Sequence, residues 1–388
     1  MSSFSPDLLI FGGGIAGLWT LLRARQAGYS ALLLESAALG GVQSIASQGI
    51  IHGGTKYALK GKLSGSAQAI ADMPGIWRDC LQGRGELDLS GVRLLSEHQY
   101  LWSSGNLTSG VAGLFASKLM RSRVKPVERQ GMPPPFDAPD FHGSLYELQE
   151  PVLDTAALMQ MLADQAKPYC WQYDPAALKV EKGRVHLGDF QLQPGRILFA
   201  AGEGNRTLLT TWGMAKPEMQ KRPLHMVMLK GRLPPVFAHC LGASANPRLT
   251  ITSYPASDGE HVWYLGGQLA EQGVERNWEA QIRAAKAELA QLLPWVDTAS
   301  AAWATLRIAR AEVATPGGRR PQESYLGITN DALVAWPTKL AFAPRLANQV
   351  LTRLEKEGLY PSGNAAFDLP LPKPVLAKLP WEKVQTWN

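Results

Sequence analysis

The segment DLLIFGGGIAGLWTLLRARQAGYSALLLE, residues 7–35, decides the fold of this chain. Its first apolar run, Leu8–Phe11, is short and uninterrupted, which is typical of a strand buried on both faces of a parallel sheet. A helical stretch follows the glycines, Gly28 ends that helix, and residues 31–34 form the next apolar run. The order strand, turn, helix, strand predicts the start of an α/β fold.

The glycines between the first strand and the helix have the spacing G-x-G-x-x-G. In that pattern the first glycine allows a tight turn, the second lets backbone amides approach a pyrophosphate, and the third lets helix and strand pack closely. An acidic residue, Glu35, ends the second strand, where its carboxylate can accept hydrogen bonds from a ribose diol. The motif predicts a dinucleotide site without separating NAD from FAD. The predicted contacts in this segment are Gly12, Gly14, Ile15, Ala16, Gly17, Glu35 and Ser36.

The composition of the whole chain limits the other classes of function. A chain of 388 residues with 45% hydrophobic residues can bury a large core, and its length suggests two domains. The net charge is +6, but the basic residues are scattered and form no long run interleaved with aromatics, so no nucleic-acid partner is predicted. A small anionic substrate or simple solubility accounts better for the excess. Three distant cysteines in no CxxC spacing predict neither a metal site nor disulfides.

Two segments resemble membrane or export signals and are interpreted otherwise. The uncharged run 8–22 has the length of a signal-peptide core, but Asp7 precedes it, glycines interrupt it, and it is too short to span a bilayer. The chain is therefore predicted to be cytoplasmic. The Pro/Lys/Trp-rich tail, 361–388, carries Trp381 and Trp387, which could rest at a membrane interface. A tail packed across its own protein is favoured.

The segment SAALGGVQSIASQGIIHGGTKYALKGKLSG, 36–65, resembles the D-amino-acid-oxidase-like superfamily of FAD-dependent oxidoreductases. Within it, GIIHGGTKY, 49–57, most resembles the branch that contains flavin-linked L-2-hydroxyglutarate and glycerol-3-phosphate dehydrogenases. The resemblance implies an FAD cofactor and a backbone that passes beside the isoalloxazine ring. The residues implied to contact FAD here are Gln43, Ser44, Ser47, Gly53 and Gly54.

Three later segments resemble the same family. The stretch LYELQEPVLDTAALMQMLADQA, 145–166, should lead back to the FAD domain through a helix with Asp154 or Thr155 as its N-cap. The apolar run ILFAAGEG, 197–204, resembles a second FAD turn, with Ala201 and Gly202 as contacts. Near the C-terminal end, WPTKLAFAPRLANQVLTRL resembles the loop and helix that face the edge of the flavin, where Lys339 and Leu340 are candidates.

The resemblance implies an α/β protein whose Rossmann-like FAD-binding domain is discontinuous. We expect that domain to comprise 1–91, 146–221 and 311–360. A second, α+β domain of 92–145 and 222–310 should contain a mostly antiparallel sheet that roofs the flavin. The runs HMVMLKG, RLTITSY and HVWYLGG suit its strands, and EAQIRAAKAELAQLLPWV suits a helix that stops near Pro294.

The candidate catalytic residues are His52 and Arg310. An imidazole such as that of His52 can accept a proton while hydride leaves the substrate carbon, or it can serve only as a hydrogen-bonding group beside FAD. The segment RIARAEVATPGGRRPQESYLG resembles the family's arginine-rich turn, in which a guanidinium binds the substrate anion. Arg310 fits that role best and Arg307 is the alternative, while Lys56 and Tyr57 are expected at the cavity mouth. Other histidines, His239 among them, are expected to be ordinary.

The sequence thus predicts an FAD-dependent dehydrogenase or oxidase that removes hydride from a CH–OH carbon of a small anionic substrate. That substrate is expected to be of the 2-hydroxy acid or polyol phosphate type, and reduced flavin would pass electrons to oxygen, a quinone or a protein carrier. Oxidation of an amine or amino acid remains an alternative on the same scaffold. A flavin-binding subunit without turnover of its own is a further alternative.

Overall fold

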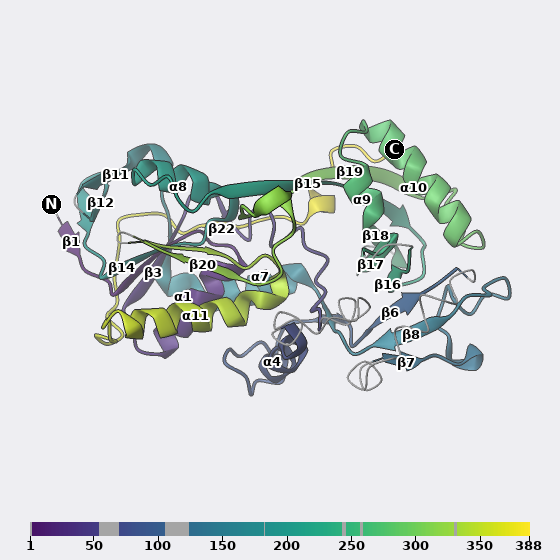
Figure 1. Cartoon of the computed structure of the whole chain (residues 1–388), viewed down its shortest axis with the longest axis horizontal. Coiled ribbons are helices and arrows are strands. Elements are labelled where there is room, and N and C mark those ends of the chain that lie inside the picture. The colour runs from purple at the N-terminus through teal and green to yellow at the C-terminus, as the bar shows by residue number, and fades with distance from the viewer. Residues whose placement is uncertain are drawn as a thin grey trace.

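The computed structural model describes residues 2–53, 70–104, 124–181, 183–242, 246–256, 259–329 and 332–388. The predicted site residues Gly54, Lys56 and Tyr57 lie outside these ranges. In Figure 1 the described chain forms an elongated molecule with two sheets at its two ends. Within the described ranges, no helix is long and apolar enough to cross a bilayer.

The first sheet has six strands in the order β10-β3-β2-β14-β21-β20. Every neighbouring pair is parallel except β20 with β21, which is antiparallel. Its strands are β2 (Leu8–Phe11), β3 (Ala31–Glu35), β10 (Cys170–Gln172), β14 (Arg196–Phe199), β20 (Tyr325–Ile328) and β21 (Leu333–Trp336). Because four of these segments are short and fully or almost fully buried, the sequence shows them as continuous apolar runs.

Both faces of this sheet are covered. Alternate residues of β2 separate into two cores, with Leu8 and Ile10 on one face and Leu9 and Phe11 on the other. The first face packs against helices α1 (Ile15–Gln26), α7 (Thr155–Ala166) and α11 (Ala343–Lys356). The second packs against the short helix α8 (Asn205–Thr211) and a small four-stranded sheet. That small sheet consists of β1 (Ser2–Phe4), β11 (Leu178–Glu181), β12 (Arg184–Leu187) and β13 (Phe190–Leu192).

The second large sheet has eight strands in the order β19-β15-β18-β17-β16-β6-β8-β7. All its pairs are antiparallel except β16 with β6. Its strands are β6 (Gln99–Trp102), β7 (Val124–Pro126), β8 (Leu145–Leu148), β15 (Met219–Gly231), β16 (Phe237–Cys240), β17 (Leu249–Pro255), β18 (His261–Gly266) and β19 (Ala302–Val313). Helix α10 (Trp278–Leu292) packs on it through an apolar core, and α9 (Gln268–Gln272) follows β18. The predicted mostly antiparallel sheet is confirmed.

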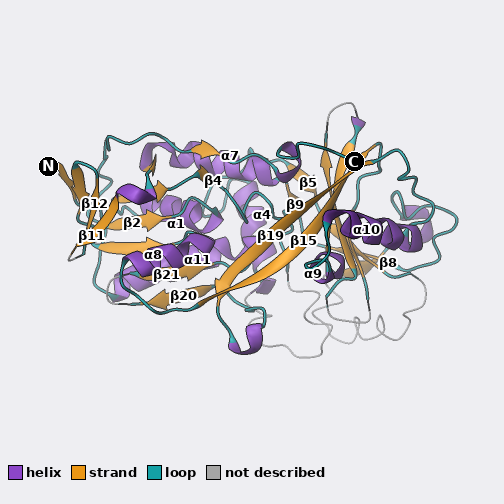
Figure 2. Ribbon diagram, turned by 90° about the horizontal axis from the view of Figure 1, so that it is seen from above, coloured by secondary structure: helices purple, strands orange, loops and turns teal. Residues whose placement is uncertain are grey.

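Two long strands join the two ends of the molecule. Strands β15 and β19 pair from Met219 with Val313 to Lys230 with Ala302 without interruption. Figure 2 shows both as long arrows that leave the second sheet and run toward the first, six-stranded sheet. They cross the expected domain limits at 222 and 310, so the second domain is attached through a continuous ribbon rather than through a flexible linker.

Short elements fill the remaining connections. Helix α4 (Met73–Leu81) contributes to the core on the α1 face of the first sheet, and there are two small two-stranded pairings. These pairings join β4 (Ala38–Leu39) with β22 (Val375–Leu376) and β5 (Leu94–Ser96) with β9 (Val152–Leu153). Of the two predicted N-cap candidates for α7, Asp154 is the N-cap, and its carboxylate accepts hydrogen bonds from the amides of Ala156 and Ala157.

The C-terminal tail packs along the protein and contacts both domains. Its residue Ala377 donates a backbone hydrogen bond to Leu39 in the first domain. The ring of Trp381 lies 4.3 Å from that of Tyr254 and 5.9 Å from that of Tyr264, both on the second sheet. Asn388 exchanges two backbone hydrogen bonds with Trp303 on β19. These contacts agree with the favoured interpretation of the tail.

We expect Trp381→Ala to lower the free energy of unfolding by about 1–2 kcal/mol, because a half-buried indole loses its packing against two tyrosines. Urea denaturation followed by tryptophan fluorescence and circular dichroism measures this. Trp278→Ala is the matched control, since Trp278 is 47% exposed and its loss should change stability by no more than about 0.5 kcal/mol. Equal effects of the two substitutions would contradict the tail's stabilising contact.

Candidate cofactor and active site

The glycine turn between β2 and α1 lies directly against a second turn that follows β14. Gly12 has φ +107°, and a Cβ atom there would lie 2.4 Å from the Cα of Ala201. A Cβ on Gly17 would lie 1.9 Å from the carbonyl oxygen of Gly12. Both positions therefore exclude every side chain. The two turns predicted to contact one cofactor are thus brought into contact with each other.

The amino-terminal end of α1 opens onto a cavity. Gly14 is its N-cap and has no side chain that could occupy the site, while Gly14, Ile15 and Ala16 line the cavity wall. The hydroxyl of Ser44 accepts a hydrogen bond from the amide of Ile15 at 2.9 Å, which fixes the 36–53 segment beside the helix. A helix end of this kind, with its amides and positive dipole facing a cavity, favours a phosphate group.

Glu35 is held in place by backbone amides. Its Oε2 accepts a hydrogen bond from the amide of Gly13 at 2.6 Å, and its Oε1 accepts one from Ala37 at 2.8 Å. The carboxylate lines the cavity together with Ser36. Tyr173 also lines this wall, and burial with the nearby charge of Glu35 raises its pKa to about 12, so the phenol stays neutral. A carboxylate fixed at this strand end can accept hydrogen bonds from a ribose.

The cavity has a volume of about 550 Å³ and joins residues far apart in the sequence. The predicted residues that line it are Gly12, Gly14, Ile15, Ala16, Glu35, Ser36, Gln43, Ser44, Ser47, His52, Ala201, Gly202, Arg310, Lys339 and Leu340. Gln43 links two of the walls, since its Oε1 accepts a hydrogen bond from the amide of Ala311 at 3.1 Å. Gly17, Gly53 and Arg307 are not part of the lining.

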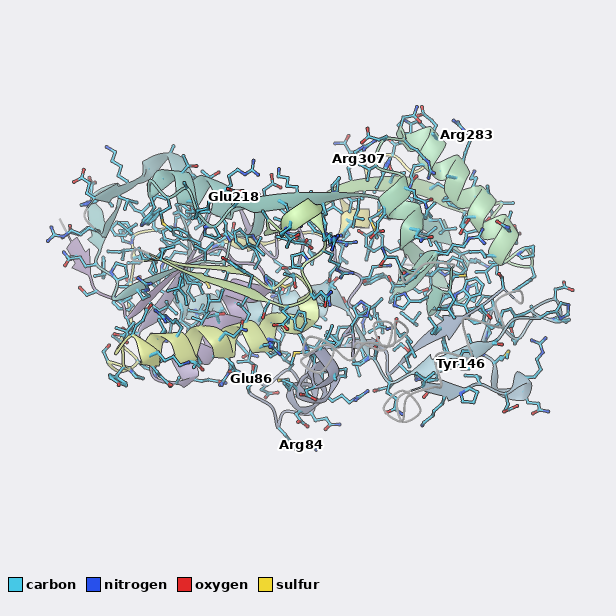
Figure 3. The ribbon with its side chains drawn as sticks, viewed as in Figure 1. Arg84, Glu86, Tyr146, Glu218, Arg283 and Arg307 are labelled. Atoms are coloured by element: carbon cyan, nitrogen blue, oxygen red, sulfur yellow. The ribbon has the colours of Figure 1, made fainter. Side chains whose placement is uncertain are left out.

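Gly53 and Arg307 have other neighbours. The amide of Gly53 donates to Glu150 Oε1 at 2.7 Å, and a Cβ there would lie 3.1 Å from Pro74 Cγ. The absence of a side chain on Gly53 thus makes room for Pro74 and Glu150 rather than for a cofactor. Arg307 is exposed and donates hydrogen bonds to the carbonyl oxygens of Val274 and Arg276. Figure 3 shows Arg307 at the outer margin of the second domain.

A histidine pair forms one wall of the cavity. His52 and His239 have nearly parallel rings, 5.7 Å apart with 18° between their planes. Glu150 Oε2 lies 3.5 Å from His52 Nδ1, and Glu150 also accepts a hydrogen bond from the side chain of Gln99. On the other side, His239 Nδ1 shares a hydrogen bond of 2.8 Å with the hydroxyl of Thr250. Glu150 is 5% exposed, so its charge acts on His52 with little screening by water.

A cluster of charged residues forms a further wall. Arg310, Arg320 and Glu271 all line the cavity, and Arg310 Nη2 lies 3.9 Å from Glu271 Oε1. Burial and the charges of Arg320 and Arg222 lower the pKa of Arg310 to about 10. The guanidinium therefore stays charged at neutral pH. Within the described ranges, Arg310 Nη1 and Arg320 Nε are buried without a hydrogen-bond partner.

The C-terminal loop closes the cavity near Lys339. Thr338 has φ +60°, which is rare for a residue with a side chain, and its hydroxyl donates to the carbonyl oxygen of Glu323 at 3.0 Å. Lys339 is 8% exposed, and its Nζ lies 4.9 Å from the centre of the Phe342 ring. Helix α11 begins at Ala343, close behind this loop. The expected arrangement of a loop followed by a helix is present.

Several cavity residues were not singled out by the sequence. These residues are His239, which the sequence predicts to be an ordinary histidine, and Arg320 and Glu271, for which it predicts no role. Glu150 lies in the stretch 145–166, which resembles the family, so the sequence does point to its segment. No signal in the sequence points to His239, because its position in the cavity depends on the pairing of β16 with β17 and β6.

Comparison with known proteins shows the class to which this arrangement belongs. A family profile described as FAD dependent oxidoreductase (DAO) matches residues 7–321. The chain therefore belongs to the DAO family of FAD-dependent oxidoreductases, and its cofactor is FAD.

Individual relatives agree with this assignment. The chain is 50% identical over 385 residues to "Probable FAD-dependent oxidoreductase PA4991" of Pseudomonas aeruginosa, covering 98% of each protein. The crystal structure of PA4991 superposes with a TM-score of 0.85 and 44% identity over 98% of this chain and 99% of that one. More distant structures share the fold. Glycine oxidase from Geobacillus kaustophilus gives a TM-score of 0.63 with 15% identity, covering 95% and 97% of the chains. L-alpha-glycerophosphate oxidase from Mycoplasma pneumoniae, with FAD bound, gives 0.64 with 15% identity, covering 94% and 99%.

The residues of this chain fit FAD. The N-terminal end of α1 faces the cavity, and its N-cap Gly14 has no side chain there, which suits a pyrophosphate. Glu35 provides a fixed acceptor for a ribose, and the cavity continues past Gln43 to His52 and Arg310. These residues would hold the nucleotide end and leave the charged walls for a substrate.

We expect Gly12→Ala to purify without FAD and with reduced stability, because the new methyl group would overlap the backbone of Ala201 and require a strained φ. The FAD-to-protein ratio from absorbance, together with thermal unfolding, measures both effects. Gly75→Ala is the control, since Gly75 lies in α4 with open space around its Cβ position. That variant should keep FAD and gain up to about 1 kcal/mol. A Gly12→Ala protein with full FAD content would contradict the close contact described between the Gly12 and Ala201 turns.

Proposed function

We propose that the chain oxidises a CH–OH carbon of a small anionic substrate, with His52 as proton acceptor and Arg310 as anion ligand. The observation that supports this most is that both side chains line one cavity with the nucleotide-binding turns. They come from segments far apart in the sequence, one before the second sheet and one on its long strand β19. Base and anion ligand therefore share one compartment with the cofactor site.

FAD supplies the hydride acceptor of such an oxidation when it is bound. His52 would take the hydroxyl proton of the substrate. Glu150, placed 3.5 Å from Nδ1, would orient the imidazole and stabilise the positive charge it gains. Because Glu150 is fixed by the amide of Gly53 and the side chain of Gln99, this orientation costs no rearrangement at the moment of proton transfer.

Arg310 would bind the substrate's anionic group. Its Nη1 is buried without a hydrogen-bond partner among the described residues, and a buried donor without an acceptor is costly. A carboxylate or phosphate oxygen supplies that acceptor and compensates the charge. The alternative arginine, Arg307, already donates to two carbonyl oxygens outside the cavity, which favours Arg310.

The finer classification rests on the sequence resemblance. We propose the branch of 2-hydroxy acid and polyol phosphate dehydrogenases because of the GIIHGGTKY segment, whose His52 lines the cavity. There are two alternatives to this proposal. One is oxidation of an amine or amino acid, and the other is a flavin-binding subunit without independent turnover. The electron acceptor is proposed to be oxygen, a quinone or a protein carrier. We propose a cytoplasmic location, supported by three cysteines that are all free and buried.

Anaerobic mixing with separate panels of hydroxy acids, polyol phosphates, amines and amino acids should bleach the flavin absorbance only with true substrates. Bleaching within the first two panels is the expected outcome, since a hydroxyl proton is what His52 is placed to accept. Bleaching confined to amines and amino acids would contradict the CH–OH proposal. A flavin that no compound reduces unless a partner is added would indicate the subunit alternative.

We expect His52→Ala to keep FAD and to reduce it about 10²- to 10⁴-fold more slowly with the substrate found, because the proton acceptor is lost. Stopped-flow absorbance under anaerobic conditions measures the rate. The control is His186→Ala, because His186 lies on β12 of the small sheet and outside the cavity lining. A His52→Ala rate equal to that of the control would remove the proposed role of His52.

Arg310→Met should raise the apparent Kd for substrate about 10- to 100-fold, because a charge-assisted hydrogen bond to the anion is lost. Substrate dependence of the anaerobic reduction rate gives this constant. Arg307→Met should leave it unchanged, since Arg307 is exposed and directed to carbonyl oxygens. If Arg307→Met gave the larger change, the assignment of the anion ligand would have to be reversed.

A further inference from the structure

The charged wall of the cavity contains one carboxylate, that of Glu271, beside its cations. Glu271 lies on the short helix α9, and its Oε1 is 3.9 Å from Arg310 Nη2. Its other oxygen, Oε2, accepts a hydrogen bond of 3.1 Å from the side chain of Asn246. Glu271, Asn246, Arg310 and Arg320 all line the cavity. The carboxylate is therefore held at the wall by Asn246 while it faces Arg310.

The ion pair of Glu271 with Arg310 is loose. At 3.9 Å the atoms are too far apart for a hydrogen bond, so Glu271 compensates part of the charge of Arg310 without satisfying its donors. Arg310 Nη1 and Arg320 Nε remain buried without an acceptor from the described residues. Arg320 lines the same cavity as Arg310, and its like charge lowers the pKa of Arg310. An anionic group bound at this wall would offer acceptors to such donors.

The neighbouring cation Arg222 does not add to this excess charge. Its guanidinium makes two hydrogen bonds, of 2.8 and 2.7 Å, to the carboxylate of Glu312, which is 1% exposed. That pair is neutral as a unit. Arg310, Arg320 and Glu271 together carry two positive charges and one negative charge, so this cluster can be neutralised by one further negative charge.

We propose that this cluster selects ligands with a single carboxylate, and that Glu271 is the residue that rejects a second negative charge. The inference rests on the proposed function, in which Arg310 binds the substrate anion. A monocarboxylate neutralises the cluster, whereas a dicarboxylate or a phosphate monoester dianion brings a second charge close to Glu271. Like charges placed together in a partly buried site are strongly unfavourable. Of the two proposed substrate types, the structure therefore favours a 2-hydroxy monocarboxylate over a polyol phosphate.

Binding of butyrate and succinate to the FAD-loaded protein tests this selection without turnover. The two ligands have the same number of carbons and differ by one carboxylate. Dissociation constants would be measured by perturbation of the flavin absorbance and by calorimetry, at low salt and at a pH where both groups of succinate are ionised. We expect wild-type protein to bind butyrate at least about tenfold more tightly than succinate. Succinate binding as tightly as butyrate would overturn the proposal.

The variant Glu271→Gln removes the charge and keeps an oxygen that can accept from Asn246. This variant should lower the dissociation constant for succinate, relative to that for butyrate, by about tenfold or more. Glu275→Gln is the matched control, because Glu275 is exposed and outside the cavity lining, and it should leave the ratio unchanged. A ratio in Glu271→Gln equal to that of the control would also overturn the proposal. The wild-type comparison stands by itself should the variant fail to fold.

Arg310→Met separates failure of this inference from failure of the proposed function. If butyrate binding is weakened in Arg310→Met but the two ligands are not discriminated through Glu271, the selection proposal is wrong and the anion site stands. If butyrate binds Arg310→Met as tightly as it binds the wild type, the anion site itself is wrong.

Discussion

The contact between the Gly12 turn and the Ala201 turn is the constraint on which the rest of the site depends. Strands β2 and β14 are neighbours in parallel register, with Phe11 opposite Phe199, so both turns leave the sheet at the same edge. Their backbones then approach so closely that a Cβ on Gly12 has no room. Parallel strands that end together place their loops around one crevice, and this geometry forms the nucleotide end of the cavity.

The substrate end of the cavity depends on the long ribbon of β15 and β19. Because this ribbon runs between the two domains without interruption, Arg310 on β19 reaches the cavity from a rigid strand. The amide of Ala311 next to it donates to Gln43, which also stands beside the turn at Gly202. Tyr254 and Tyr264 fix the 36–53 segment from the other side through hydrogen bonds to the carbonyl oxygens of Ser47 and Ala46. The walls are therefore positioned by both domains at once.

Local signals predicted the parts of the fold that local physics determines. The glycine turn, the Asp154 cap and the apolar runs of the parallel sheet follow from neighbouring residues, and the structure has each of them. The cavity's histidine pair and charged cluster do not. His239 meets His52 through strand pairing across the second sheet, and Glu271 meets Arg310 because α9 packs against long strands. Such long-range contacts have no periodicity or spacing in the sequence that would reveal them.

The same arrangement determines how much of the chain must be synthesised before the cofactor cavity can form. The cofactor cavity needs the turn at Gly12, the turn at Ala201, the strand that carries Arg310 and the loop at Lys339. A nascent chain that has emerged only through the Gly12 turn has one strand of the six-stranded sheet, β2, and no closed pocket. The complete cavity for FAD therefore forms only after the segment around Leu340 has been synthesised. Until then, strand β14 lacks its neighbour β21 and the core on one face of β2 lacks helix α11, and these are apolar surfaces that a chaperone would have to protect.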